Sequence, residues 1–474
     1  MGLTNSIERR ITRCVASVLV VLLLSGTAAA QTTLVGIGDS IGEGVQSADA
    51  SAASQPFSFI NLISTRFGQP FPLPLIQTGI FGQVGNVSGR SRINPTVRTF
   101  NLAVSGADVN SALNDLATAT TTAQIDSETE LVLFPRVGSQ IQIAESLNPL
   151  YTVAWIGNND ALGAALAYDQ LNATQLTPVA SFTADFQQIV ARLKATGTKA
   201  VFGTIPDITG IGLLMNHADL VRFLGSSYGL QPGHLTTAFA MFMVRLGIED
   251  PSVFSDPNWV LDPAEQAIIS NHIVQLNDVI RSTVWANGMA VADTYFVFEY
   301  LASQPLNLWG VPLTTRFMGG LFSLDGVHPS NIGQGIAAMF FIDALNRTYG
   351  VNIPQIDGPL LFALLKDDPF VDIDGDGRVR GRFGAGFIET VFAVLNLTGD
   401  TEGPPQSAVS AAAPSTMGAP AEKGSSKILA RTDKAAVALF EEYKKATGKD
   451  LRTMATEERR RAVHELLGQL RLAK

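Results

Sequence analysis

The sequence has almost no cysteine: Cys14 is the only one in 474 residues. If residues 1–30 are removed, as argued below, the remaining chain has neither a disulfide scaffold nor a thiolate nucleophile. A large protein without disulfides depends on its hydrophobic core for stability. With 46% apolar residues and 26 phenylalanines, this chain can bury ample apolar surface.

Basic residues are also in short supply, since 33 lysines and arginines face 42 aspartates and glutamates, for a formal net charge of −9. An acidic balance disfavours nucleic acid and anionic membrane surfaces as partners. Beyond residue 24 there is no apolar stretch long enough and free enough of charge to span a membrane.

The first thirty residues are typical of a secretory signal peptide. Arg9, Arg10 and Arg13 form a basic start, Val15–Leu24 is a short apolar run, and Ala28–Ala30 offers a small-residue cleavage site. An uncleaved membrane anchor is the alternative, but the apolar run is too short for an ordinary membrane-spanning helix. We therefore predict export, either to the periplasm or out of the cell.

Short apolar runs alternate with longer helical patterns between residue 31 and about residue 360. This alternation is typical of an α/β fold with a parallel sheet. Each run is followed by Gly, Asp, Asn or Pro, and ligands of such folds bind beyond the carboxyl ends of the strands. The expected strands are Thr33–Ile37, Thr99–Val104, Tyr151–Ile156, Ala200–Thr204 and Met289–Ala292.

One helix start is well marked. Asp262 provides an N-cap carboxylate, Pro263 occupies the first helical position and Glu265 the third. The apolar spacing from Ile268 to Ile280 then predicts a helix with one buried face.

A stretch rich in Phe, Met and Leu runs from Thr209 to Gly247. We favour additional hydrophobic core there, because apolar stripes at helical spacing usually pack inside a protein. A lid or an acyl-chain groove is the alternative, since methionine-rich surfaces adapt to apolar ligands.

The C-terminal part divides into three predicted segments. Residues 361–400 form an Asp/Gly-containing extension, residues 401–427 a linker rich in Pro, Ala and Ser, and residues 428–474 a basic helical hairpin. Within the extension, Asp372, Asp374 and Asp376 match the first half of an EF-hand-type calcium loop. Position twelve of that loop is Phe383 instead of a bidentate carboxylate, so we favour a simple Asp/Gly-rich turn.

Two serines lie in glycine-flanked sequences typical of nucleophiles. Ser40 directly follows a predicted strand, in Gly-Asp-Ser-Ile-Gly-Glu-Gly, where a tight turn would expose its hydroxyl. Ser227 matches Gly-x-Ser-x-Gly, but that motif requires a strand before it, and the preceding residues have a helical pattern. Ser40 is therefore the better candidate, although a hydroxyl needs a base to become a useful nucleophile.

His328 is the best candidate for that base among five histidines. Asp325 lies three residues before it and could bond one ring nitrogen, which would fix the tautomer and favour the imidazolium. Donors for a developing oxyanion could come from the Ser40 N–H, the Gly106 N–H and the Asn159 side chain, all close to the ends of predicted strands.

These four segments together resemble the GDSL esterases and lipases of the SGNH hydrolase superfamily. The order is Gly-Asp-Ser, Ala-Val-Ser-Gly, Gly-x-Asn-Asp and Asp-Gly-Val-His-Pro, and the resemblance covers roughly residues 33–355. One departure is Ile41, where the family name expects leucine, and this conservative exchange should not impair the site. The extra length at residues 207–260 leaves the substrate preference open.

The resemblance implies a three-layer α/β/α fold around a mainly parallel five-stranded sheet, without a metal or organic cofactor. It also implies that Ser40, Asp325 and His328 form a triad, with Ser40, Gly106 and Asn159 as the oxyanion hole. We expect a secreted carboxylic ester hydrolase acting on lipid or other small acyl esters. The alternatives are an O-deacetylase of a polysaccharide or cell-wall glycan, and a binding protein that keeps the fold without catalysis.

Overall fold

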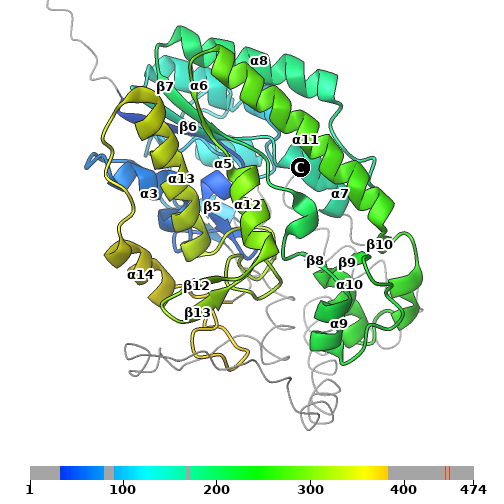
Figure 1. Cartoon of the computed structure of the whole chain (residues 1–474). Helices are drawn as coiled ribbons and strands as arrows, with labels where there is room; N and C mark the ends of the chain where they lie inside the picture. Colours follow the sequence, from blue (N-terminus) through cyan, green and yellow to red (C-terminus); the bar gives the residue numbers. More distant parts are fainter. Residues whose placement is uncertain (1–31, 79–89, 167–170, 383–443, 445–447, 449–474) are drawn as a thin grey trace, which may run out of the picture.

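Most of the chain between the predicted signal peptide and the predicted linker is described by the computed structural model (Figure 1). The described residues are 32–78, 90–166, 171–382, 444 and 448. The predicted signal peptide, the linker and nearly all of the predicted tail lie outside them. Within the described part of the chain, no helix combines the length and apolar character needed to cross a bilayer.

Short strands and longer helices alternate along the chain. In order, the elements are β1 (Leu34–Gly38), α2 (Ser40–Glu43), β2 (Val45–Gln46), β3 (Asp49–Ala50), α3 (Phe59–Thr65), β4 (Ile76–Thr78), β5 (Arg90–Arg92), α4 (Val109–Asn114), α5 (Glu128–Leu133), α6 (Gln140–Leu147), β6 (Tyr151–Trp155), α7 (Asn159–Leu166), α8 (Val179–Ala195), β7 (Lys199–Gly203), β8 (Leu214–Met215), α9 (His217–Leu224), β9 (Leu235–Thr237), α10 (Ala238–Arg245), β10 (Val260–Leu261), α11 (Pro263–Ala286), β11 (Ala290–Ala292), α12 (Thr294–Ser303), β12 (Leu306–Leu308), β13 (Val311–Leu313), α13 (Asn331–Tyr349) and α14 (Gly358–Lys366).

The central sheet has four parallel strands in the order β1-β6-β7-β11. Four of the five predicted strands are therefore present, each within one residue of its expected bounds. The fifth, Thr99–Val104, is a correction: it runs beside β1 and pairs with it at a single parallel bridge, Gly36 with Asn101. The ladder stops on either side of this bridge because other residues take the groups it would need: the Gly38 N–H donates to Gln140 Oε1 at 3.0 Å, and the Phe100 N–H donates to the Pro72 carbonyl at 3.2 Å.

Alternate residues of the strands bury into two separate cores, which makes the architecture three layers. Val35 and Phe202 face the core formed with α4, α6, α8 and α11, whereas Leu34 and Val201 face the core formed with α3 and α13. Figure 1 shows α8 and α11 on one side of the sheet and α3 and α13 on the other. The predicted α/β/α fold is confirmed, and its strands are buried on both faces as parallel strands usually are.

The Phe- and Met-rich stretch forms a small unit at one end of the molecule, where β8, β9 and β10 make an antiparallel sheet beside α9 and α10 (Figure 1). Met215 and Met241 are fully buried, and Phe223 and Phe242 each pack edge-on against Phe317. The stretch is therefore hydrophobic core over most of its length, and Ile211 near its start lines the apolar pocket that opens at Ser40.

The predicted helix start at Asp262 is confirmed, since its carboxylate accepts the N–H groups of Ala264 and Glu265 at the start of α11. The described part of the extension, residues 361–382, packs against the same body. There α14 lies against α13, and Val371 and Val379 are buried.

Candidate active site

A tight turn at the carboxyl end of β1 carries Ser40. Asp39 caps α2 by accepting the Ile41 N–H at 2.9 Å, so Ser40 begins the helix with its hydroxyl beyond the edge of the sheet. Gly44 ends this single turn at φ 94°, and a Cβ there would lie 2.7 Å from Gln55 Cα. The glycines of the motif thus let the turn lie directly on its neighbours.

Ser40, His328 and Asp325 form a continuous line of hydrogen bonds. His328 Nε2 lies 2.7 Å from Ser40 Oγ, and His328 Nδ1 lies 2.7 Å from Asp325 Oδ2. All three side chains are at least nine-tenths buried. The structure therefore brings together residues 288 positions apart in the arrangement that serine activation requires.

Asp325 is held as a carboxylate by its surroundings. Its Oδ1 accepts the N–H groups of Val327 and His328, and its Oδ2 accepts the Ala48 N–H at 2.7 Å. Burial alone would raise the pKa of Asp325, but the charge of His328 and these hydrogen bonds hold it below its ordinary value. An ionised Asp325 fixes His328 with a proton on Nδ1, which leaves Nε2 to accept the Ser40 proton.

The predicted oxyanion donors come from the ends of two further segments. Asn159 begins α7 just beyond β6, and its Nδ2 donates one hydrogen bond to the Ala107 carbonyl at 2.8 Å, which leaves its second N–H available. Gly106 lies in the turn just before Ala107, at φ 79°, and its N–H has no partner among the described residues. Asn159 lines the same pocket as Ser40, whereas Gly106 is not among the lining residues.

Three buried carboxyl groups tie these segments together, and sequence reasoning missed all three. Asp39 accepts the Asn158 amide at 2.7 Å, Glu43 accepts the Ser105 N–H at 2.7 Å, and Asp160 accepts the Val109 N–H at 3.0 Å. Burial raises the pKa of Asp39 to about 6, of Asp160 to about 7 and of Glu43 above its ordinary value. Acidic side chains are rarely fully buried, so no pattern in the sequence marked them.

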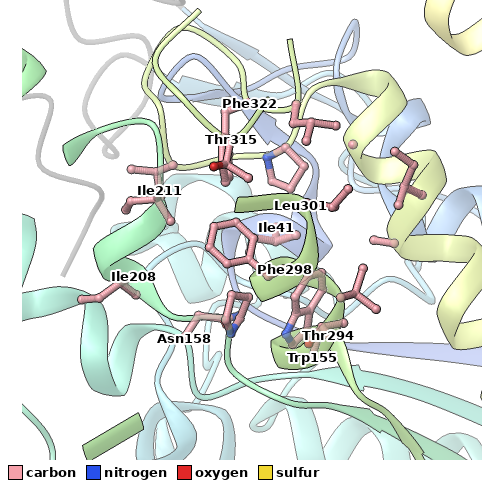
Figure 2. A pocket seen from close by; sticks show the side chains of 18 of the residues that line it. Ile41, Trp155, Asn158, Ile208, Ile211, Thr294, Phe298, Leu301, Thr315 and Phe322 are labelled. Carbon is pink, nitrogen blue, oxygen red and sulfur yellow. The ribbon is translucent and has the colours of Figure 1, made fainter. Parts of the chain in front are cut away.

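An apolar pocket opens at Ser40, with about 940 Å³ of empty space including its mouth (Figure 2). Its walls come from α12, from the loop after β7 and from the start of α13, and its polar lining is confined mainly to Asp39, Ser40, Asn158 and Asn159 together with two threonines. Figure 2 shows Phe298, Leu301, Ile208 and Ile211 around this space. Sequence reasoning missed α12, because its run of aromatic and aliphatic residues has no single apolar face.

The other sequence candidates lie elsewhere. Ser227 is in the loop after α9 and does not line the pocket. The residues before it form a helix and not a strand, as predicted. Asp372, Asp374 and Asp376 bring carboxylate oxygens within 4.8 Å of one another, and Asp372 accepts N–H groups from Gly375, Asp376 and Gly377. Those bonds are the ones expected of an Asp/Gly-rich turn.

The model of GDSL-like lipases and acylhydrolases matches residues 34–341, more than half of the chain. The chain belongs to this family. It is accordingly an SGNH-type hydrolase and a carboxylic ester hydrolase. The matched range contains Ser40, Gly106, Asn159, Asp325 and His328, as the sequence resemblance implied.

Several solved structures are similar to this chain at low sequence identity. TesA is 14% identical, with 67% of this chain and 99% of TesA covered, at a TM-score of 0.31. LAE5, an alpha/beta hydrolase from the metagenome of Lake Arreo in Spain, is 16% identical over 67% of this chain and 96% of its own, at 0.32. A variant of Axe2, an acetyl xylan esterase from Geobacillus stearothermophilus, is 14% identical over 68% and 97%, at 0.32. No curated protein matches the chain. With TM-scores this low, family membership rests on the family model.

Proposed function

We propose that this hydrolase is exported and cleaves esters with an apolar acyl chain through an acyl-enzyme on Ser40. The observation that carries the proposal is the hydrogen-bonded line Ser40–His328–Asp325, in which Ser40 lines a pocket whose walls are mostly apolar. The acyl chain would occupy that pocket, and the alcohol would leave toward solvent. The basic and apolar segments of residues 1–30 support export.

The reaction begins when His328 Nε2 takes the proton of Ser40 and the alkoxide attacks the ester carbonyl. The carbonyl oxygen becomes an oxyanion, which the Ser40 N–H, the Gly106 N–H and the free amide N–H of Asn159 stabilise. His328 then passes its proton to the leaving alcohol. Water, activated by the same imidazole, hydrolyses the acyl-enzyme and regenerates Ser40.

Asp325 keeps His328 in the required tautomer throughout and stabilises the transient imidazolium. Desolvation strengthens this effect, since His328 is 0% and Asp325 6% exposed. The low pKa of Asp325 keeps its charge in place while His328 gains and loses a proton.

The apolar lining predicts how the rate depends on the acyl chain. Each CH₂ group buried in the pocket contributes about 0.8 kcal/mol, which is about fourfold in kcat/KM. Activity should therefore rise from acetate through butyrate and stop rising when the pocket is full. A glycan deacetylase would instead prefer acetate.

The test is hydrolysis of p-nitrophenyl esters from acetate to palmitate by residues 31–474, by Ser40→Ala and by Val297→Phe. Val297 is a half-buried wall residue of α12, so a larger side chain should shorten the preferred acyl chain without disturbing the core. Phe296→Ala is the matched control, because Phe296 is on the same helix, is 71% exposed and does not line the pocket.

We expect Ser40→Ala to be inactive, Val297→Phe to prefer shorter esters and Phe296→Ala to keep the wild-type profile. An optimum at acetate in the wild type would favour the deacetylase. No activity on any p-nitrophenyl ester would favour a narrow glycan substrate or a binding protein that retains the fold.

A further inference from the structure

Glu43 is a fully buried acidic residue at the end of the helical turn that Ser40 begins. Its Oε2 accepts two hydrogen bonds from Ser105, one from the N–H at 2.7 Å and one from the hydroxyl at 2.5 Å. Ser105 directly precedes Gly106. A single side chain thus connects the turn that carries one oxyanion donor, the Ser40 N–H, to the turn that carries another.

Other hydrogen bonds join the segment before Ser105 to β1 and α2. Asn101 Nδ2 donates to the Gly42 carbonyl at 2.7 Å. Val104 donates its N–H to the Gly38 carbonyl at 3.0 Å, which is the last backbone bond between the segment and β1. Beyond it the chain leaves the sheet, and Gly106 adopts φ 79°. Asn159 holds the far side of this turn at the Ala107 carbonyl, whereas the two bonds from Ser105 to Glu43 are the hydrogen bonds that, among the described residues, join the turn directly to α2.

The surroundings of Glu43 argue against a role in stability alone. Its Oε1 is buried and has no partner among the described residues. The charged groups near it are Arg90 and Arg92 on β5, Glu128 on α5 and Asp49 on β3. A buried carboxyl with an unpaired oxygen lowers stability, and an apolar side chain of similar volume would be cheaper to bury.

We propose that Glu43 is a positioning residue for ester hydrolysis, which sets the Gly106 N–H at the distance and angle from the Ser40 N–H that the oxyanion requires. This inference rests on the proposed function of Ser40. Oxyanion donors act when they lie 2.7–3.1 Å from the developing charge. A misplacement of about 1 Å can cost about a hundredfold in rate, so an anchor outside the site can control the rate within it.

The experiment compares Glu43→Ala, Glu43→Asp and Glu43→Gln. Glutamine retains an oxygen at the same reach that can accept both Ser105 bonds, whereas aspartate retains the charge but is one CH₂ too short. Glu130→Ala is a matched control. Glu130 is also buried, and its Oε1 likewise accepts the N–H and hydroxyl of one residue, Thr118, but neither residue belongs to the turns that carry Ser40 and Gly106.

Each variant is assayed with p-nitrophenyl butyrate, and the rate is divided by the number of active sites titrated with a p-nitrophenyl alkylphosphonate. A trifluoromethyl ketone with a butyl chain is the second probe, because its adduct with serine carries an oxyanion. A purely structural role would reduce the number of titratable sites and leave the rate per site unchanged.

We expect Glu43→Ala and Glu43→Asp to lose about tenfold to a hundredfold in kcat per titrated site, with KM changed by less than about threefold. The affinity for the trifluoromethyl ketone should fall by the same factor as kcat/KM. Glu43→Gln should stay within about threefold of the wild type, and Glu130→Ala should keep its kcat per site whatever happens to its stability.

An active Glu43→Asp beside an inactive Glu43→Gln would overturn the proposal, because charge rather than reach would then matter. Wild-type kcat per site in Glu43→Ala would overturn it as well. If Glu43→Ala does not fold, the Asp and Gln variants decide between the same two results. Activity in Ser40→Ala would refute the proposed function itself, which separates that failure from a failure of the role of Glu43.

Discussion

Asp325→Asn is the substitution that most sharply tests the geometry of the triad. The carboxylate accepts at Oδ2 from His328 Nδ1 and the Ala48 N–H, and at Oδ1 from two backbone N–H groups and the Ser323 hydroxyl. An amide has only one oxygen, so its NH₂ group must face donors at one of these positions.

In Asp325→Asn, the NH₂ group of the new side chain is best accommodated where Oδ2 lies in the wild type. There His328 can move its proton to Nε2 and accept at Nδ1, so that only the Ala48 N–H loses its partner. At the Oδ1 position two backbone N–H groups would lose theirs. We therefore expect the histidine to adopt the wrong tautomer, with an N–H directed at Ser40 Oγ, 2.7 Å away, where a lone pair is needed.

The expected loss in kcat is about 10⁴-fold, or about 5.4 kcal/mol of transition-state stabilisation. The free energy of unfolding should fall by only about 1–3 kcal/mol, because one buried N–H is left unpaired. Kinetics with p-nitrophenyl butyrate and urea denaturation measure the two quantities separately. Ser323→Ala is the control: it removes the longest bond to Asp325, at 3.2 Å, and the bond that its Oγ accepts from the Ser47 N–H, but it leaves the carboxylate intact and should cost less than about tenfold in kcat. An Asp325→Asn variant that keeps more than about a tenth of wild-type kcat would refute this reasoning.

Two further substitutions test the packing around the site. Burial raises the pKa of Asp39 from 3.8 to about 6, so folding favours the protonated carboxyl group. The contribution of Asp39 to the free energy of unfolding is therefore fully present below about pH 4 and is lost as pH rises through about 6. In Asp39→Asn, Asn158 can turn so that its Oδ1, which has no partner among the described residues, accepts from the new amide N–H. Relative to the wild type, the free energy of unfolding of the variant should therefore rise by on the order of 3 kcal/mol between about pH 4 and about pH 7. Urea denaturation of both proteins across this pH range measures it, and an equal pH dependence in the two would contradict the prediction. Gly38→Ala should lower the free energy of unfolding by about 1–3 kcal/mol or more, because its Cβ would lie 2.6 Å from the Trp155 carbonyl oxygen. The control Gly358→Ala, whose Cβ meets nothing within 4 Å, should melt like the wild type.

The sequence predicted the parts of this protein that follow from local pattern. Strands such as Tyr151–Ile156 are short apolar runs ended by turn residues, and the cap at Asp262 is a purely local arrangement, so both could be placed within a residue. The segment Thr99–Val104 has the same composition, yet it pairs at only one bridge, because the distant side chain of Gln140 takes the Gly38 N–H and the Phe100 N–H donates to Pro72.

The residues of the site also differ in how far the sequence could predict them. Ser40, Asp325 and His328 stand in motifs, so their proximity could be expected before the structure was known. Glu43 and the wall residue Phe298 could not be predicted, because their roles depend on segments that meet only in the folded chain. Glu43 contacts Ser105, 62 residues later, and Phe298 lines the pocket with residues from four other parts of the sequence.

Covalent labelling of the nucleophile tests the central claim most directly. The chain of residues 31–474 is incubated with a p-nitrophenyl alkylphosphonate, digested and mapped by mass spectrometry. We predict one adduct per molecule, on the peptide that contains Ser40, and no labelling in Ser40→Ala. An adduct on the peptide that contains Ser227, or labelling that survives in Ser40→Ala, would contradict the account.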